Sequence, residues 1–219
     1  MKLRDFWPGM LALVVAGLVG VVFRDRLPEQ VPMHWNLHGE VDRWGPRGQA
    51  LVLLPGVGLL MAGLLVVLPK IDPRRESHAL HGHAYRLVGN ALLLFLAGMH
   101  LVVLAASAGY AVPMNRIIGI GVGLLFAVVG NVLTQARPNW IFGIRTPWTL
   151  SSERSWRETH RVGGRLMVAG GLLTVLAGIL VPQWIVGAIL VGVLVPSLAM
   201  VVYSYLVWKR EHDAMTKEA

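Results

Sequence analysis

The chain has 219 residues, of which 55% are hydrophobic and only 15% are charged, and its mean hydropathy is +0.59. This composition excludes an ordinary water-soluble globular protein and indicates a membrane protein. The formal net charge of +8 raises the question of a nucleic-acid partner, and the absence of cysteine excludes disulfides, thiolate zinc sites and cysteine nucleophiles.

Six apolar segments are long enough to cross a bilayer as helices. They cover residues 7–23, 51–68, 87–108, 117–133, 166–181 and 184–208. The first segment follows a basic N-terminus, as in a secretory signal, but no small-residue cleavage site follows it, so we expect a retained span. The sequence predicts an all-α polytopic membrane protein with a six-helix bundle. We divide it into residues 1–68, 69–134 and 135–219, each part containing two spans.

The segments between the spans share the basic residues unevenly. With the N-terminus inside, the outer segments hold only Arg24, Arg26, Arg43, Arg47 and Arg116, and the inner segments hold the other fifteen of the twenty basic residues. Cytoplasmic loops carry such an excess of Lys and Arg. We therefore expect both termini in the cytoplasm, and we expect no direct nucleic-acid binding because topology accounts for the charge.

The interiors of the predicted spans are nearly free of ionisable groups. No Asp, Glu, Lys or Arg lies in mid-span, and the polar side chains that stand out are Asn90, His100, Ser107, Asn131 and Thr174. Ionisable groups at membrane depth usually mark ion or proton pathways, so their scarcity argues against a pump or an ion-coupled transporter. We expect His100 to donate an interhelical hydrogen bond or to lie near the outer end of its span, not to relay protons.

Gly119 and Gly123 form a G-x-x-x-G pair in the fourth span. Small residues at this spacing allow two helix backbones to approach closely in a membrane. The surrounding "GIGVG" imitates a nucleotide-binding fingerprint, but no strand precedes it and no acidic residue follows at the proper distance. We therefore interpret it as a packing face.

The segment between the first two spans, residues 24–50, is long and faces outward in this topology. Pro32 favours an extended conformation for the residues around it, and Asn36 and Gly39 favour turns. Trp35 and Trp44 suit the membrane interface. We expect a structured cap on the outer surface.

Two groups of residues raise the question of a metal. His34, His38, Glu40 and Asp42 in the outer segment offer imidazole and carboxylate, which are ordinary zinc ligands. The alternative is that His34 and Asp42 hydrogen-bond the backbone of their own loop. The stretch "HALHGH" at residues 78–83 is a weaker candidate, because His-rich stretches are also common in solvated loops. We favour the structural interpretation and predict no metal and no cofactor.

The inner segment before the fifth span is polar and rich in Trp and Arg, unlike a flexible linker. Trp140, Phe142 and Trp148 can lie at the level of the lipid headgroups, while Arg145 reaches a phosphate or a carbonyl. The alternative is a simple interfacial anchor, but the dense order of polar and aromatic residues suggests a surface for recognition.

A helix is predicted to follow directly. Ser151 or Ser152 is a good N-cap, and Glu153 lies in the first turn, where a negative charge is favourable. Charged residues then repeat every four positions, as do Trp156 and His160, so we expect a surface helix that continues into the fifth span. A catalytic set of Ser152, Glu153 and His160 is conceivable, but no G-x-S-x-G or H-E-x-x-H motif supports it.

Two stretches resemble a known family. Residues 139–164, "NWIFGIRTPWTLSSERSWRETHRVGG", resemble the signature segment of the SdpI-type bacterial immunity proteins. Residues 31–47, "VPMHWNLHGEVDRWGPR", resemble the N-terminal domain of unknown function that is often joined to it and is typified by Pro-x-His-aromatic-Asn. The six-span layout is also similar. The resemblance implies a multi-pass protein of the bacterial cytoplasmic membrane.

The resemblance also implies a function. The type member protects a producing bacterium from a secreted, membrane-active toxic peptide and draws a soluble transcriptional repressor to the membrane. This chain would then be a non-enzymatic immunity or receptor protein, with the lipid bilayer, such a peptide and such a repressor as partners. The residues that would shape its two binding surfaces are Pro32, His34, Trp35, Asn36, Gly39 and Asp42 outside, and Asn139, Gly143, Arg145, Thr146, Pro147, Trp148, Thr149, Ser152, Trp156, His160, Arg161 and Gly163 inside.

Two other classes of function stay open from the residues alone. A membrane-embedded, metal-dependent enzyme would use the His and acidic side chains of one cap. A transporter or a lipid-handling protein would bind its substrate within the bundle of spans. The apolar spans argue against an ion pathway.

Overall fold

A computed structural model describes residues 1–74 and 82–218. Within these residues, six helical segments are long and apolar enough to cross a membrane, so the predicted all-α, six-span architecture is confirmed. His78 and His81 of the His-rich stretch lie outside the described residues. The elements in chain order are α1 (Trp7–Val22), β1 (Gln30–Trp35), β2 (Val41–Pro46), α2 (Arg47–Ile71), α4 (Gly82–Ser107), α5 (Met114–Leu133), α6 (Pro147–Ser151), α7 (Glu153–Leu180), α8 (Ile185–Ile189) and α9 (Val195–Glu218).

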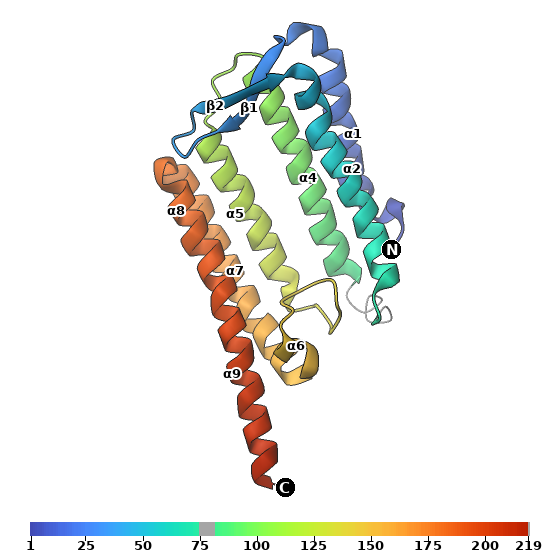
Figure 1. Cartoon of the computed structure of the whole chain (residues 1–219), viewed down its shortest axis with the longest axis vertical. Helices are drawn as coiled ribbons and strands as arrows, with labels where there is room; N and C mark the ends of the chain where they lie inside the picture. The colour runs from blue at the N-terminus through green and yellow to red at the C-terminus, as the bar shows by residue number, and fades with distance from the viewer. Residues whose placement is uncertain (75–81, 219) are drawn as a thin grey trace.

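The spans form two groups that meet in the middle of the bundle (Figure 1). Helices α1, α2 and α4 pack on one side, where Leu13 of α1 lies against Gly58 of α2 and Phe6 lies against Gly89 of α4. Helices α5, α7, α8 and α9 pack on the other side. The two groups meet at α4 and α5, where the ring of Phe95 lies over Gly121.

Helices α5 and α7 pack backbone against backbone. A Cβ added to Gly123 would lie 2.6 Å from the carbonyl oxygen of Gly171, and one added to Gly130 would lie 2.7 Å from that of Gly164. No side chain larger than hydrogen fits at these positions. The close packing predicted from the G-x-x-x-G pair is confirmed, and it extends along α5 beyond that pair.

The outer segment contains a β-hairpin, which forms the one sheet among the described residues. Strands β1 and β2 pair antiparallel, with Pro32 opposite Trp44 and Trp35 opposite Val41, and the register is irregular on both sides of His34. The extended conformation predicted around Pro32 is therefore part of a strand. Helix α2 begins at Arg47, directly after β2. The predicted span began only at residue 51, so the helix starts earlier than the apolar segment.

The sixth span is irregular. A π-helical turn, Leu190–Leu194, separates α8 from α9. Pro196 follows this turn and has no N–H to donate to the carbonyl of Gly192, which disrupts regular α-helical bonding there. At the same level Gly170 of α7 contacts Gly192, and a Cβ at Gly170 would overlap the Gly192 carbonyl oxygen. Helix α9 then continues past residue 208, the predicted end of the span, to Glu218.

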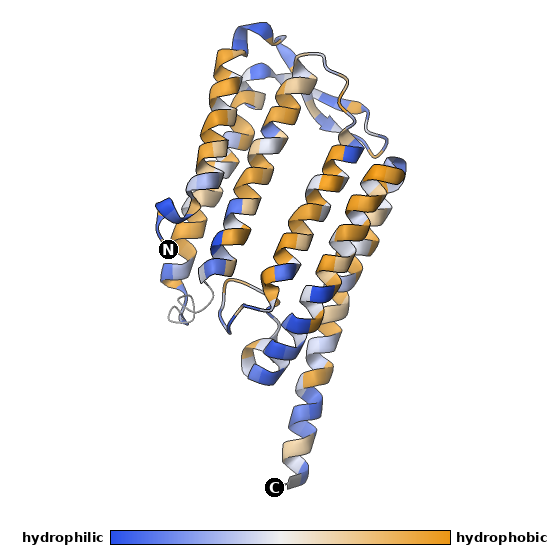
Figure 2. Cartoon of the chain, turned by 180° about the vertical axis from the view of Figure 1, so that it is seen from behind, coloured by the Kyte–Doolittle hydropathy of each residue, from blue (hydrophilic) through white to orange (hydrophobic). Residues whose placement is uncertain are grey.

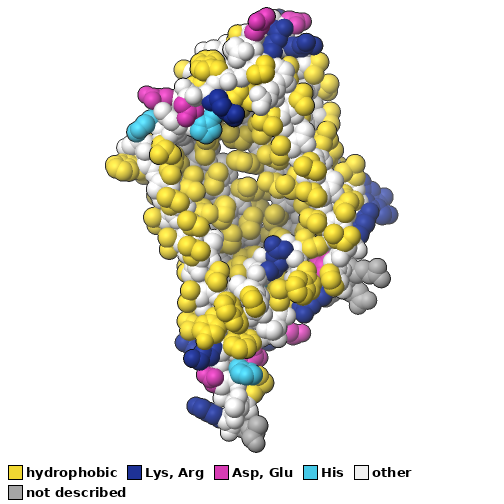
Figure 3. All heavy atoms as spheres, in the orientation of Figure 1, with side chains coloured by type: hydrophobic (Ala, Val, Ile, Leu, Met, Phe, Trp, Pro, Cys, Tyr) yellow, Lys and Arg dark blue, Asp and Glu magenta, His cyan; other side chains and the backbone are white. Residues whose placement is uncertain are grey.

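Apolar side chains cover the middle of the bundle, and charged side chains gather at its two ends (Figures 2 and 3). The hairpin lies at one end, and α6 with the start of α7 lies at the other (Figure 1). His100 in α4 is fully buried, and its ring makes no hydrogen bond with any described residue. Of the two alternatives for His100, the interhelical hydrogen bond is therefore wrong, whereas the ring does lie beside Gly20, near the end of α1 that leads to the hairpin.

Candidate functional site: two polar caps at opposite ends of the bundle

The hairpin cap, residues 30–46, has a turn that is organised by Asn36. The side-chain oxygen of Asn36 accepts hydrogen bonds from the backbone N–H of His38 at 2.9 Å and of Glu40 at 3.0 Å. Its amide nitrogen donates to the Glu40 carboxylate at 3.1 Å. Gly39 has a φ of 82°, a conformation that glycine adopts without strain. Asn36 and Gly39 therefore shape the turn.

His34 and Asp42 bond each other across the hairpin. The Nδ1 atom of His34 lies 2.6 Å from Oδ1 of Asp42, and both side chains are exposed. The prediction that they bond the loop backbone is wrong, because the irregular register places the two side chains side by side. Among the described residues, no group of three or more His, Asp or Glu side chains is arranged to hold a metal ion.

The hairpin cap contacts both groups of spans. Val31 in β1 is buried against Ala50 of α2 and Leu104 of α4. At the tip, the side chain of Asn115 in α5 donates a hydrogen bond to the carbonyl of Leu37 at 3.0 Å. The hairpin cap therefore links the two groups across the end of the bundle.

The opposite end carries the arginine-rich cap, residues 134–164. Its loop is folded around Asn139, whose side chain is completely buried. The Asn139 oxygen accepts from the N–H groups of Ile141 at 2.8 Å and Phe142 at 2.6 Å, and its nitrogen donates to the carbonyls of Arg137 at 2.7 Å and Phe142 at 2.9 Å. One amide thus satisfies four backbone groups of a loop that has no regular structure of its own.

His160 fixes the next part of this loop. Its Nε2 accepts a hydrogen bond from the Ile144 N–H at 2.9 Å, so its Nδ1 carries the proton and donates to the Trp156 carbonyl at 2.8 Å. The rings of His160 and Trp156 stack at 4.1 Å. Gly143, with a φ of 115°, lies directly against the His160 ring and leaves no space for a Cβ. His160 is therefore neutral and structural.

Helix α6 is tied to α9. Thr146 is its N-cap and accepts a hydrogen bond from the Thr149 N–H at 3.2 Å, and Pro147 occupies the first helical position. The Thr146 hydroxyl also lies 2.9 Å from the hydroxyl of Ser204 in α9. The Thr149 hydroxyl donates to the Ile144 carbonyl at 2.9 Å. Buried hydroxyl groups therefore hold the N-terminal end of this short helix.

The start of α7 is also tied to α9. Of the two serines predicted as candidates, Ser152 caps α7 by accepting from the Ser155 N–H at 2.9 Å, and its hydroxyl donates to the Glu211 carboxylate. Trp148 packs against Tyr205, with ring centroids 5.1 Å apart. The predicted surface helix that continues into the fifth span is confirmed, because α7 runs unbroken from Glu153.

The expectations for Arg145 and for Phe142 have different outcomes. Trp140 is half exposed and Arg145 donates to its carbonyl at 2.6 Å, in agreement with the prediction that Arg145 reaches a phosphate or a carbonyl. Phe142, in contrast, is buried and packs edge-on against Tyr85 of α4 at 6.0 Å. Its expected place at the lipid headgroups is wrong, because the loop folds back under the bundle.

The arginine-rich cap also links the two groups of spans. Asp72, just after α2, accepts a hydrogen bond from the Trp140 N–H at 3.1 Å. Arg74 donates to the Leu150 carbonyl at 3.2 Å, and Tyr85 of α4 packs on Phe142. Both ends of the bundle are thus closed by segments that contact α2 or α4 on one side and α5, α7 or α9 on the other.

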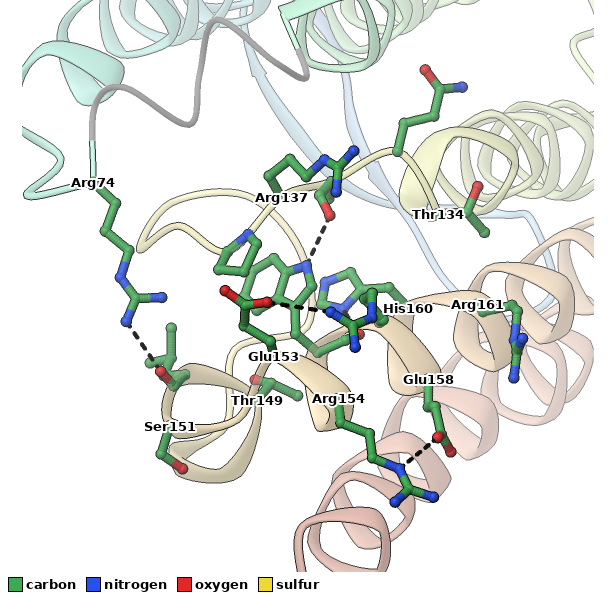
Figure 4. A pocket seen from close by; sticks show the side chains of 16 residues that line it. Arg74, Thr134, Arg137, Thr149, Ser151, Glu153, Arg154, Glu158, His160 and Arg161 are labelled. Atoms are coloured by element: carbon green, nitrogen blue, oxygen red, sulfur yellow. Dashed lines mark hydrogen bonds and ion pairs between the residues drawn. The ribbon is translucent and has the colours of Figure 1, made fainter. Parts of the chain in front are cut away.

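A partly open cavity of about 1080 Å³ lies in this cap (Figure 4). Its walls are residues 134–138, the end of α6, the start of α7 and Arg74. Along α7, Arg157 pairs with Glu153 at 3.2 Å, as the four-residue charge spacing predicts, and Arg154 pairs with Glu158 at 2.9 Å. Among the predicted site residues, Thr149, Trp156, His160 and Arg161 line the cavity, whereas Gly163 packs against Met200 of α9.

The structure brings in residues that the sequence did not single out. Ser204 and Glu211 of α9 and Asp72 after α2 hold the cap through the hydrogen bonds given above. Each lies far along the chain from its partner. A serine hydroxyl in a largely apolar span was the available signal for Ser204, but nothing in the sequence names its partner.

The catalytic arrangement of Ser152, Glu153 and His160 has no support in this geometry. Both nitrogens of His160 are engaged with the backbone, so the ring has no free acceptor for a serine proton. Ser152 serves as a helix cap, and Glu153 pairs with Arg157.

Comparisons with known proteins match both caps. Residues 135–206 match the model of the SdpI/YfhL protein family, and residues 11–59 match a domain of unknown function, DUF1648. The chain is similar to the Immunity protein SdpI of Bacillus subtilis (strain 168), with 27% identity over 207 residues, or 92% of this chain and 94% of that protein. The chain therefore resembles the SdpI-type membrane proteins in both caps. No solved structure matches it.

The resemblance to the SdpI-type family is therefore confirmed. The SdpI/YfhL match covers the arginine-rich cap and α9 up to Leu206, and the DUF1648 match covers the hairpin cap between parts of α1 and α2. Together with the six apolar spans, the similarity makes this chain a multi-pass protein of the bacterial cell membrane and a homologue of a membrane immunity protein.

Proposed function

We propose that this chain protects its cell from a secreted, membrane-active toxic peptide and is not an enzyme. The observation that carries the proposal is the similarity to the Immunity protein SdpI, which extends over 92% of the chain and so includes both caps and the spans between them. The engaged nitrogens of His160 further support a binding function over a catalytic one.

The hairpin cap is the surface proposed to meet the peptide. It exposes Leu37 and Trp44, at 65% and 59%, beside the hydrogen-bonded pair of His34 and Asp42. Apolar and charged side chains thus lie together at the end of the bundle where, by the distribution of basic residues, the outside begins. Such a mixed surface suits an amphipathic peptide that reaches it from the lipid headgroup region.

The arginine-rich cap is proposed to report peptide binding to a soluble transcriptional repressor in the cytoplasm. Both caps bridge the same two groups of spans, so a change at the α4–α5 boundary alters both caps together. A peptide that binds one packing of the two groups more tightly shifts the population toward it. The repressor would then distinguish the two packings at the other end.

Protection can be measured directly in cells. We expect expression of this chain in a Bacillus subtilis strain that lacks its own SdpI to restore survival beside the toxin-producing parent strain. Arg145→Ala and Trp148→Ala should each abolish this survival, because they remove the contacts with the Trp140 carbonyl and the Tyr205 ring that shape the arginine-rich cap.

The matched control is Arg210→Ala, an exposed arginine of α9 outside the cavity, which should protect like the wild type. Membrane fractions must contain each variant at wild-type amounts. Survival of the Arg145→Ala and Trp148→Ala strains would show that protection does not depend on the arginine-rich cap. Failure of the wild-type chain to protect, although inserted in the membrane, would reject the immunity proposal.

A further inference from the structure

The cavity of the arginine-rich cap collects positive charge from separate parts of the chain. Figure 4 shows the side chains that line it, which come from the segment after α2, from the segment after α5, from α6 and from the start of α7. Two glutamates, Glu153 and Glu158, also line it. The arginines on its wall are Arg74, Arg137, Arg154, Arg157 and Arg161.

The glutamates leave this positive charge only partly balanced. Each of them pairs with an arginine of its own helix, Glu153 with Arg157 and Glu158 with Arg154. Arg74 and Arg161 take part in no ion pair among residues 1–74 and 82–218. Arg74 uses one N–H on the Leu150 carbonyl, and a guanidinium group carries five N–H donors, so several remain for a ligand.

One wall of the cavity is rigid before any ligand arrives. The Trp156 side chain is buried, and its Nε1 donates to the Ala136 carbonyl at 2.8 Å. The stacked ring of His160 is held at both nitrogens. A wall that is already ordered loses little conformational entropy when a ligand binds.

We propose that this cavity binds a phosphate ester, which is either the headgroup of an anionic phospholipid or a soluble phosphate compound. Guanidinium groups match the oxygens of phosphate in pairs, and basic pockets between membrane helices at the polar end of a bundle bind phospholipid headgroups. The volume of about 1080 Å³ is large enough for a headgroup. The proposal does not depend on the immunity function.

The test uses the purified full-length protein in a neutral detergent. Its melting temperature is recorded during titration with dioleoyl-phosphatidylglycerol, with dioleoyl-phosphatidylcholine and with inorganic phosphate, since a ligand that binds the folded state raises this temperature. The test variant is Arg74→Gln with Arg161→Gln. The control is Lys209→Gln with Arg210→Gln, which removes the same charge from exposed positions of α9 that do not line the cavity.

We expect phosphatidylglycerol to stabilise the wild type more than phosphatidylcholine does, and the test variant to bind it about tenfold more weakly, while the control binds like the wild type. Stabilisation by inorganic phosphate, with no preference between the two lipids, would support the same site and assign a soluble ligand. Equal weakening in test and control variants, or no stabilisation by either anion, would overturn the proposal. If the double variant does not fold, Arg161→Gln alone decides, because its side chain makes no hydrogen bond among the described residues.

Discussion

At the scale of single residues, the arginine-rich cap depends on a few buried polar groups that each satisfy several backbone atoms. Asn139 and His160 are fully buried, and together they bond the backbone on both sides of Gly143. A buried polar group left without a partner costs about 1–3 kcal/mol, so the loss of any one partner affects the others. The cap is therefore a cooperative unit in spite of its irregular backbone.

Gly143→Ala tests this unit. The substitution places a Cβ at a positive φ and against the His160 ring, which cannot turn away without losing two hydrogen bonds. We expect a loss of about 2–4 kcal/mol in the free energy of unfolding. Denaturant unfolding in detergent, followed by Trp fluorescence, gives the measurement.

The matched control is Gly109→Ala, whose φ of 89° is also positive but whose Cβ would meet nothing within 4 Å. It should cost about 1–2 kcal/mol, from backbone strain alone. Equal losses for the two variants would show that the contact with His160 contributes nothing.

At the scale of elements, backbone contact between helices holds the second group of spans together. Helices α5 and α7 touch through Gly123 and Gly171 and again through Gly130 and Gly164. Lipid tails compete with apolar side chains, so close packing of this kind supplies the association between spans. The arginine-rich cap depends on it, since the cap is built on the ends of these same helices.

Gly123→Ala should separate α5 from α7 and lower stability by about 1–3 kcal/mol, because the new methyl group meets the backbone of Gly171. The control is Gly98→Ala on the exposed face of α4, where nothing lies within 4 Å. Alanine favours helix over glycine, so this control should be neutral or slightly stabilising. The melting temperatures of the two purified variants test this prediction, and Gly123→Ala alone should lower the melting temperature. The same decrease in both variants would contradict the packing argument.

At the scale of the whole molecule, two polar caps lie at opposite ends of an apolar bundle (Figures 1 and 3). The uneven distribution of basic residues predicts that the hairpin cap is outside and the arginine-rich cap is in the cytoplasm. Recognition of an external peptide and of an internal repressor requires this arrangement.

The absence of cysteine makes the topology easy to measure. Arg43→Cys places a thiol on the exposed face of β2, and Glu153→Cys places one at the start of α7. A membrane-impermeant maleimide should label the first variant in intact cells and the second only after the membrane is permeabilised. Labelling of both in intact cells, or of position 153 alone, would reverse or reject the proposed orientation.

The sequence by itself determined the six spans, the two polar caps, a serine cap at position 151 or 152 and the continuity of α7. These features follow from hydropathy and helix capping, which depend on residues close together in the chain. Only the tertiary structure decided that His34 bonds Asp42, that Phe142 is buried on Tyr85, that Ser204 holds Thr146 and that His100 has no partner among the described residues. Such contacts depend on how helices and strands pack side by side, and local patterns carry no information about that register.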